Sequence, residues 1–150
     1  MRDPHPVHRE VVANDLRHHV LEWDGGGRTT VLCLHGFLDL AWGFAPLAPS
    51  LAEAGYHVVA PDLRGHGDTD RVGAGGYYYF SDYLPDVADL VDRLARERLA
   101  LVGHSMGGTV ALLYAGVFPR RPERVAALEA IHVRPREGES PPRRALEWIE

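Results

Sequence analysis

The order of hydrophobic runs along the chain predicts a hairpin of strands followed by a buried strand. Residues 7–12 and 16–23 are short β-branched segments, and the three residues between them, Ala13, Asn14 and Asp15, have the chemistry of a hairpin turn. Residues 29–34 form a continuous apolar run after a glycine-rich turn. Such a run is typical of a strand that is buried on both faces of a parallel sheet.

The remaining hydrophobic pattern alternates between helical and strand-like segments. Helical spacing or apolar runs of helical length predict helices over residues 40–54, 81–98 and 109–118, and short apolar runs predict strands over residues 56–60, 99–102 and 125–131. This alternation implies right-handed crossovers between parallel strands, so we expect an α/β fold with a doubly wound, mostly parallel sheet. Ligands of such sheets bind at the carboxyl ends of the strands.

The motif with the clearest chemistry lies between the predicted strand 99–102 and the helix that follows it. Residues 103–107 read Gly-His-Ser-Met-Gly, which matches the GxSxG pattern of a nucleophile elbow. A sharp turn from strand to helix strains the serine backbone and exposes its hydroxyl above the sheet, and it requires glycines where side chains would collide. Ser105 is therefore the candidate catalytic nucleophile.

A serine nucleophile needs backbone donors for the oxyanion that forms when it attacks a carbonyl group. The amide of Met106 lies at the predicted helix N-terminus, where unpaired N–H groups and the helix dipole favour negative charge. The amide of Phe37, close to the end of the predicted strand 29–34, is the expected second donor. Phe37 and Met106 are thus the candidate oxyanion hole.

Three blocks, in this order along the chain, resemble the α/β-hydrolase superfamily. They are His-Gly-Phe at residues 35–37, Asp-Leu-Arg-Gly-His-Gly at residues 62–67, and residues 103–108. The resemblance covers about residues 31–131 and is closest to the serine hydrolase-like branch of bacterial esterases. It implies an α/β-hydrolase sheet with an antiparallel N-terminal hairpin, and it identifies the chain as the N-terminal portion of such a protein, with the C-terminal strands missing.

The resemblance also assigns structural roles to several histidines. It implies that His35 shapes the oxyanion loop, that His104 points back into the fold, and that residues 62–67 form a structural turn in which Arg64 and His66 are scaffold. The aromatic residues near these blocks could each have a structural role or line a substrate site. We expect Trp42 and Phe44 to belong to the core rather than to an acyl pocket, and residues 77–80 to anchor a helix rather than to line a substrate cleft.

The resemblance places the triad acid after the strand that follows the nucleophile helix, where Glu129 is the candidate. The same block resembles haloalkane dehalogenases, but those enzymes use an aspartate nucleophile where this chain has Ser105, which disfavours dehalogenation. His132 is the one histidine after Ser105, and it is too close to Glu129 in sequence for both to fill triad roles easily. The catalytic histidine is therefore expected beyond Glu150.

Composition bounds these predictions. A chain of 150 residues with 45% hydrophobic content suits one domain over residues 1–150, incomplete at the C-terminus, with a linker and the start of a lid in residues 132–150. The 16 basic and 21 acidic residues are interspersed and give a net charge of −5, which argues against a nucleic-acid partner.

The sequence has neither a signal peptide nor a transmembrane run, and Cys33 is its only cysteine, so a soluble, cytoplasmic protein without a membrane partner is expected.

The function predicted from the sequence is hydrolysis of a small-molecule ester or similar acyl substrate, with no metal or cofactor. Two alternatives stay open. The chain is either a catalytically silent fragment or pseudo-enzyme that lacks the triad histidine, or a non-hydrolytic member of the superfamily, such as an acyl transferase or a haloperoxidase-like enzyme. The sequence does not predict the oligomeric state.

Overall fold

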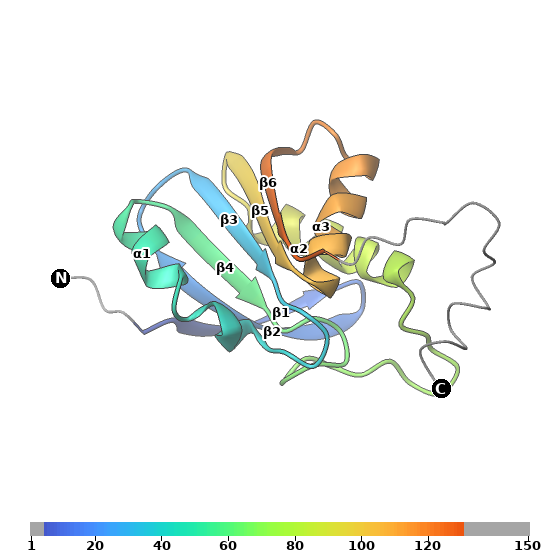
Figure 1. Ribbon diagram of the computed structural model, residues 1–150. Helices are drawn as coiled ribbons and strands as arrows, with labels where there is room; N and C mark the ends of the chain where they lie inside the picture. Colours follow the sequence, from blue (N-terminus) through green and yellow to red (C-terminus); the bar gives the residue numbers. More distant parts are fainter. Residues whose placement is uncertain (1–4, 131–150) are drawn as a thin grey trace.

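The computed structural model describes residues 5–130, in which six strands form one twisted sheet (Figure 1). The strands are β1 (Val7–Ala13), β2 (Leu16–Asp24), β3 (Thr29–Leu34), β4 (His57–Pro61), β5 (Arg98–His104) and β6 (Pro122–Leu128). Their spatial order is β1-β2-β4-β3-β5-β6. The pairs β1–β2 and β2–β4 are antiparallel and the other neighbours are parallel, which confirms the expected α/β-hydrolase arrangement.

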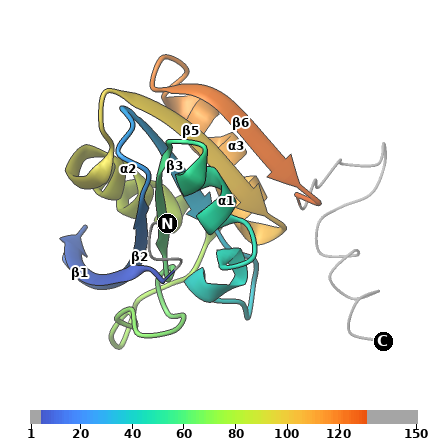
Figure 2. The ribbon, with the colours of Figure 1, turned by 90° about the vertical axis from the view of Figure 1, so that its left-hand side faces the viewer.

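Helices cover both faces of this sheet (Figure 2). They are η1 (Ala41–Phe44), α1 (Ala48–Glu53), η2 (Phe80–Asp82), α2 (Tyr83–Leu94) and α3 (Met106–Val117). The period-two alternation of the strands divides the core between the faces. In β4, Val59 packs in the cluster that contains α2 and α3 residues, whereas Val58 and Ala60 pack in the cluster that contains η1 and α1 residues.

The N-terminal hairpin has the predicted turn. Asn14 and Asp15 have φ angles of 48° and 59°, and Ala13 pairs directly with Leu16, so the turn holds two residues with positive φ, as type I′ requires. The Asn14 side chain also donates to Asp86 of α2 over 2.7 Å. The hairpin is therefore fixed to the helical layer as well as to the sheet.

Several predicted boundaries were wrong. The single helix expected over residues 40–54 is instead η1 and α1, because Pro46 interrupts the helical hydrogen bonds and Pro49 suits the first turn of a new helix. Helix α2 ends at Leu94, α3 begins at Met106, and β6 runs over Pro122–Leu128 rather than residues 125–131. The expected linker and lid in residues 132–150 lie outside the described residues.

None of the helices within residues 5–130 combines the length and the apolar character needed to cross a membrane.

Candidate active site

Ser105 occupies the turn between β5 and α3, and its backbone is strained. Its φ and ψ angles are 49° and −114°, a combination that residues other than glycine rarely adopt. The Ser105 amide donates to the carbonyl of Leu128 at the end of β6 over 2.8 Å, and the Ser105 carbonyl accepts from the Thr109 amide over 3.1 Å. Neighbouring strand and helix together hold the serine in this conformation.

The glycines of the elbow are required by backbone contacts. A Cβ atom on Gly103 would lie 2.3 Å from the carbonyl oxygen of Gly107, and one on Gly107 would lie 2.1 Å from that of Leu34. A Cβ atom on Gly36 would lie 3.4 Å from the Ser105 Cβ atom. The first two contacts explain the GxSxG spacing, and the third shows that the loop after β3 lies directly against the nucleophile.

That loop, residues 35–41, carries the predicted donor Phe37 and is termed the oxyanion loop below. It turns sharply, with the Asp39 amide donating to the Gly36 carbonyl over 3.2 Å and Leu38 at a φ of 60°. His35 is fully buried, its Nδ1–H donates to the Gly36 carbonyl over 2.7 Å, and its Nε2 accepts from the Leu63 amide over 2.9 Å. Burial lowers the His35 pKa, which favours the neutral ring that these two bonds need.

Met106 begins α3, so its amide has the first helical position, where no intrahelical acceptor exists. The amides of Phe37 and Met106 thus belong to two segments that meet at Ser105. Their role as oxyanion donors stays a prediction.

Glu129 directly follows Leu128, whose carbonyl binds the Ser105 amide, so the structure brings the predicted acid to the elbow. Its φ is 47° and its side chain is exposed. The role of Glu129 in orienting a histidine stays a prediction, and His132 lies outside the described residues.

His104 differs from the expectation. Its side chain is exposed rather than directed into the fold, and its Nδ1 atom would lie 3.0 Å from a Cβ atom on Gly36. His104 therefore lies beside the oxyanion loop.

A pocket of about 640 Å³ opens beside the elbow. Its lining is mainly aromatic and aliphatic, and it includes both predicted oxyanion residues: Phe37, Leu38, Gly65, His66, Tyr78, Phe80, Tyr83 and Met106. Tyr78 and Phe80 line this pocket and are 47% and 38% exposed, so these two side chains do more than anchor a helix, while a role of residues 77–80 in a substrate cleft stays untested. Phe44 is buried as predicted, whereas Trp42 is 44% exposed.

One group among the described residues brings potential metal ligands together, namely His19, Asp62 and Asp68, whose ligand atoms lie within 4.8 Å of one another. The Asp62 carboxylate is already occupied, since it accepts from the Ala41 amide over 2.7 Å and from His19 Nδ1–H over 2.8 Å. It also accepts from the Asp68 amide over 3.2 Å. These bonds satisfy both oxygens, so the group is explained as a hydrogen-bond network.

Comparison with known proteins identifies the class to which this fold and site belong. A family model described as alpha/beta hydrolase fold matches residues 29–148, so the chain belongs to that family. Epoxide hydrolase A of Mycobacterium tuberculosis is 38% identical over 132 residues, which are 85% of this chain and 39% of that protein. A serine hydrolase-like protein of Danio rerio is 36% identical over 115 residues, which are 77% of this chain and 35% of that protein.

A solved structure is similarly close. The crystal structure of a membrane phospholipase A, described as a bacterial virulence factor, superimposes with a TM-score of 0.84 at 31% identity and covers 98% of this chain and 46% of that one. The chain thus spans less than half the length of each of these three proteins.

Proposed function

We propose that the protein is a serine hydrolase of esters or similar acyl compounds and that Ser105 is its nucleophile. The observation that carries the proposal is the strained position of Ser105 between β5 and α3, with the oxyanion loop against it. In the proposed reaction the Ser105 hydroxyl attacks a carbonyl carbon and loses its proton to a histidine base. The resulting acyl-enzyme is then hydrolysed by water.

Two backbone amides and a carboxylate complete the proposed machinery. The amides of Phe37 and Met106 bind the oxyanion of the tetrahedral intermediate, and Glu129 orients the histidine. We assign the base to a histidine that follows the nucleophile and the acid along the chain, because α/β-hydrolases carry the triad in the order serine, acid, histidine. The reaction needs no metal or cofactor.

The chemistry of serine separates this proposal from epoxide hydrolysis, which the name of the mycobacterial relative states for that protein. Attack of a serine oxygen on an epoxide carbon would open the ring and leave an ether, which has no carbonyl carbon for water to attack. Attack on an acyl group leaves an ester, which water hydrolyses. A serine at the nucleophile position therefore supports turnover of acyl substrates, in line with the name of the zebrafish relative.

The pocket beside the elbow supports an apolar substrate. Three aromatic side chains of residues 78–83 line it, together with Phe37 and Leu38 of the oxyanion loop. Such a lining stabilises a hydrocarbon or aromatic group of a small molecule through burial of apolar surface.

A second candidate is a catalytically silent chain, and it is favoured by the sequence after Ser105, in which His132 is the one histidine of the printed sequence and stands three residues from Glu129. Labelling with a fluorophosphonate probe distinguishes the two. We expect the full-length gene product to label and the Ser105→Ala variant to lose at least about 1,000-fold in labelling rate. Undiminished labelling of the alanine variant would exclude Ser105 as the nucleophile, and an unlabelled wild-type protein would favour the silent chain.

A further inference from the structure

Two segments that are distant in sequence lie side by side behind the nucleophile. The oxyanion loop is bonded to residues 62–69, termed the frame segment here, which follow β4. The Leu63 amide donates to His35 Nε2 over 2.9 Å, the Ala41 amide donates to Asp62 Oδ1 over 2.7 Å, and the Leu38 amide donates to His66 Nε2 over a longer 3.4 Å. Both ends and the middle of the loop are thus tied to the frame segment.

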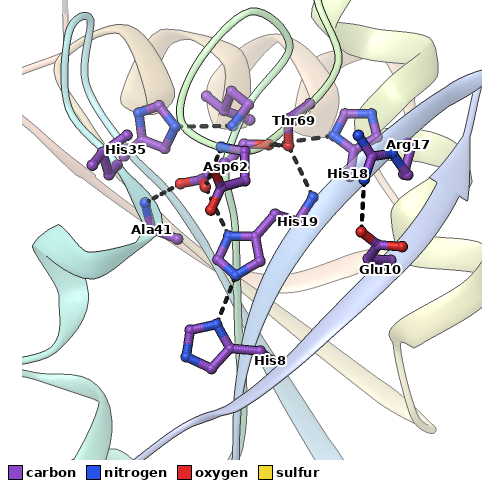
Figure 3. A network of polar contacts seen from close by, with 12 residues as sticks. His8, Glu10, Arg17, His18, His19, His35, Ala41, Asp62 and Thr69 are labelled. Atoms are coloured by element: carbon purple, nitrogen blue, oxygen red, sulfur yellow. Dashed lines mark hydrogen bonds and ion pairs between the residues drawn. The ribbon is translucent and has the colours of Figure 1, made fainter.

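The Asp62 carboxylate fixes the position of Ala41, at the end of the oxyanion loop. It is 3% exposed, and while one carboxylate oxygen accepts from the Ala41 amide, the other accepts from His19 Nδ1–H and the Asp68 amide (Figure 3). A Cβ atom on Gly67 would lie 2.2 Å from that second oxygen, so the chain itself closes around the carboxylate. Charge-assisted bonds in a buried site are strong and directional.

The carboxylate is backed by the sheet. His19 belongs to β2, and its amide donates to Thr69 Oγ1 over 3.0 Å, while the Thr69 hydroxyl donates to the Asp62 carbonyl over 2.6 Å. In Figure 3 these groups converge on Asp62 from both sides. Through Asp62, the position of Ala41 therefore depends on His19 of strand β2.

His66 holds the middle of the loop from the pocket side. Its Nδ1–H donates to the Arg64 carbonyl over 3.0 Å, which leaves the Nε2 lone pair facing the Leu38 amide. Its ring centroid lies 5.0 Å from that of His35 and 6.0 Å from that of Phe37. The residues on each side of Phe37 are in this way fixed by contacts with His35 or His66.

We infer that Asp62 and His66 are positioning residues that aim the Phe37 amide at the oxyanion of the Ser105 reaction. This inference rests on the proposed function, because it assigns that amide a catalytic task. Neither side chain touches the reacting atoms, and each acts through a loop amide on one side of the donor. A donor displaced by about 1 Å loses most of its value in the transition state, so the loss appears in kcat rather than in KM.

The first measurement does not depend on activity. Amide hydrogen exchange of Phe37, Leu38 and Ala41 is compared in wild type, Asp62→Asn and His66→Phe. Asparagine keeps the volume but offers one acceptor oxygen in place of two, and phenylalanine keeps the ring but lacks Nε2. We expect exchange in the loop to rise about 10-fold or more while the core amides of β3 stay protected.

Thr30→Val is the matched control. Thr30 is buried at the opposite end of β3, where its hydroxyl is hydrogen-bonded to His57 Nδ1 and to the Arg96 amide. This variant removes buried hydrogen bonds as the others do, but it leaves the loop untouched, so loop exchange should match wild type. Equal loop exchange in Asp62→Asn, His66→Phe and the control would overturn the inference.

The second measurement is hydrolysis of p-nitrophenyl acetate by the full-length gene product. We expect Asp62→Asn to lower kcat about 10- to 100-fold and to leave KM within about 2-fold, because Asp62 does not line the pocket. His66→Gln, whose carbonyl oxygen can accept from Leu38, should recover part of the kcat lost in His66→Phe.

The two measurements separate the inference from the proposed function. Faster loop exchange with an unchanged kcat would show that the loop is positioned but is not an oxyanion hole, which refutes the catalytic part. A wild type that neither labels nor turns over would refute the proposed function, and the exchange data alone would then decide whether Asp62 and His66 hold the loop.

Discussion

The nucleophile elbow and the oxyanion loop lie against each other, but they are held by different means. The elbow is fixed mainly by backbone contacts, in which Gly103 and Gly107 allow close approach and the Ser105 amide binds a neighbouring strand. The oxyanion loop is fixed by side chains of the frame segment, which is separated from it along the chain by η1, α1 and β4. A motif of five residues thus specifies one half of the site, whereas the other half depends on a second segment of the chain.

The largest effect is expected from a methyl group added inside the elbow. In Gly107→Ala the Cβ atom would lie 2.1 Å from the Leu34 carbonyl oxygen, so β3 and α3 must separate. We expect the free energy of unfolding to fall by at least about 4 kcal/mol, measured by urea denaturation. Gly116→Ala in the same helix has open space around its Cβ and should be neutral or stabilising by up to about 1 kcal/mol. A tolerated Gly107→Ala would show that the elbow is not limited by backbone packing.

The next effect concerns the frame segment. Arg64 is buried and bonds Asp86 of α2 with both Nε and Nη2, over 2.6 and 2.7 Å, and this pairing raises its pKa. Arg64→Met would leave the buried Asp86 carboxylate without its cation and should cost about 3 kcal/mol of unfolding free energy. The exposed pair of Arg93 and Asp89 on the same helix supplies the control, since Arg93→Met should cost less than about 0.5 kcal/mol. Similar costs for the two variants would contradict the stabilising role of the buried Arg64–Asp86 pair.

A smaller effect tests the strain at the nucleophile. Because Ser105 has a φ of 49°, glycine at this position relieves strain that alanine retains. We expect Ser105→Gly to unfold at higher urea concentration than Ser105→Ala, by about 1 kcal/mol, although neither variant has a nucleophile. A glycine variant that is less stable than the alanine variant would place the strain elsewhere in the site.

The smallest effect is a pH dependence of the free energy of unfolding, to which His35 of the oxyanion loop contributes. Burial lowers the pKa of His35, so the unfolded chain binds a proton at a higher pH than the folded chain does. The free energy of unfolding should therefore fall as the pH drops below about 6.5. Burial lowers the His18 pKa as well and adds to the same slope. Carboxylates titrate at lower pH than histidines: the bond of Asp24 to Arg96 lowers the pKa of Asp24 to about 2, so its effect on stability lies below the pH interval in which the histidines act.

Urea denaturation at pH 7.5, 6.5 and 5.5 measures this slope. His35→Gln removes one of the titrating groups, so its stability should change less over the interval than that of wild type. An equal slope in the variant would exclude protonation of His35 as a source of acid sensitivity.

Local sequence pattern predicted those parts of the fold that depend on neighbours in sequence. The turn at Asn14 and Asp15, the buried strand β3 and the elbow around Ser105 each follow from a few adjacent residues. The break between η1 and α1 was not predicted, because the apolar residues at positions 40–54 have the spacing of one continuous helix. Pro46 is the local signal for that break. The role of His66 in the pocket could not be read from its block, since it depends on how β4 lies beside β3 and on where Phe37 turns.

The buried Cys33 of β3 allows a thiol-reactive label to be directed to the nucleophile position. The thiol is fully buried between the sheet and α1, and burial raises its pKa to about 12, so it does not form a thiolate at neutral pH. Maleimides and similar electrophiles should therefore leave the described part of the chain unmodified while it is folded. A Ser105→Cys variant would then carry one reactive sulfur, at the elbow, and a fluorescent label attached there would report directly on how open the pocket is.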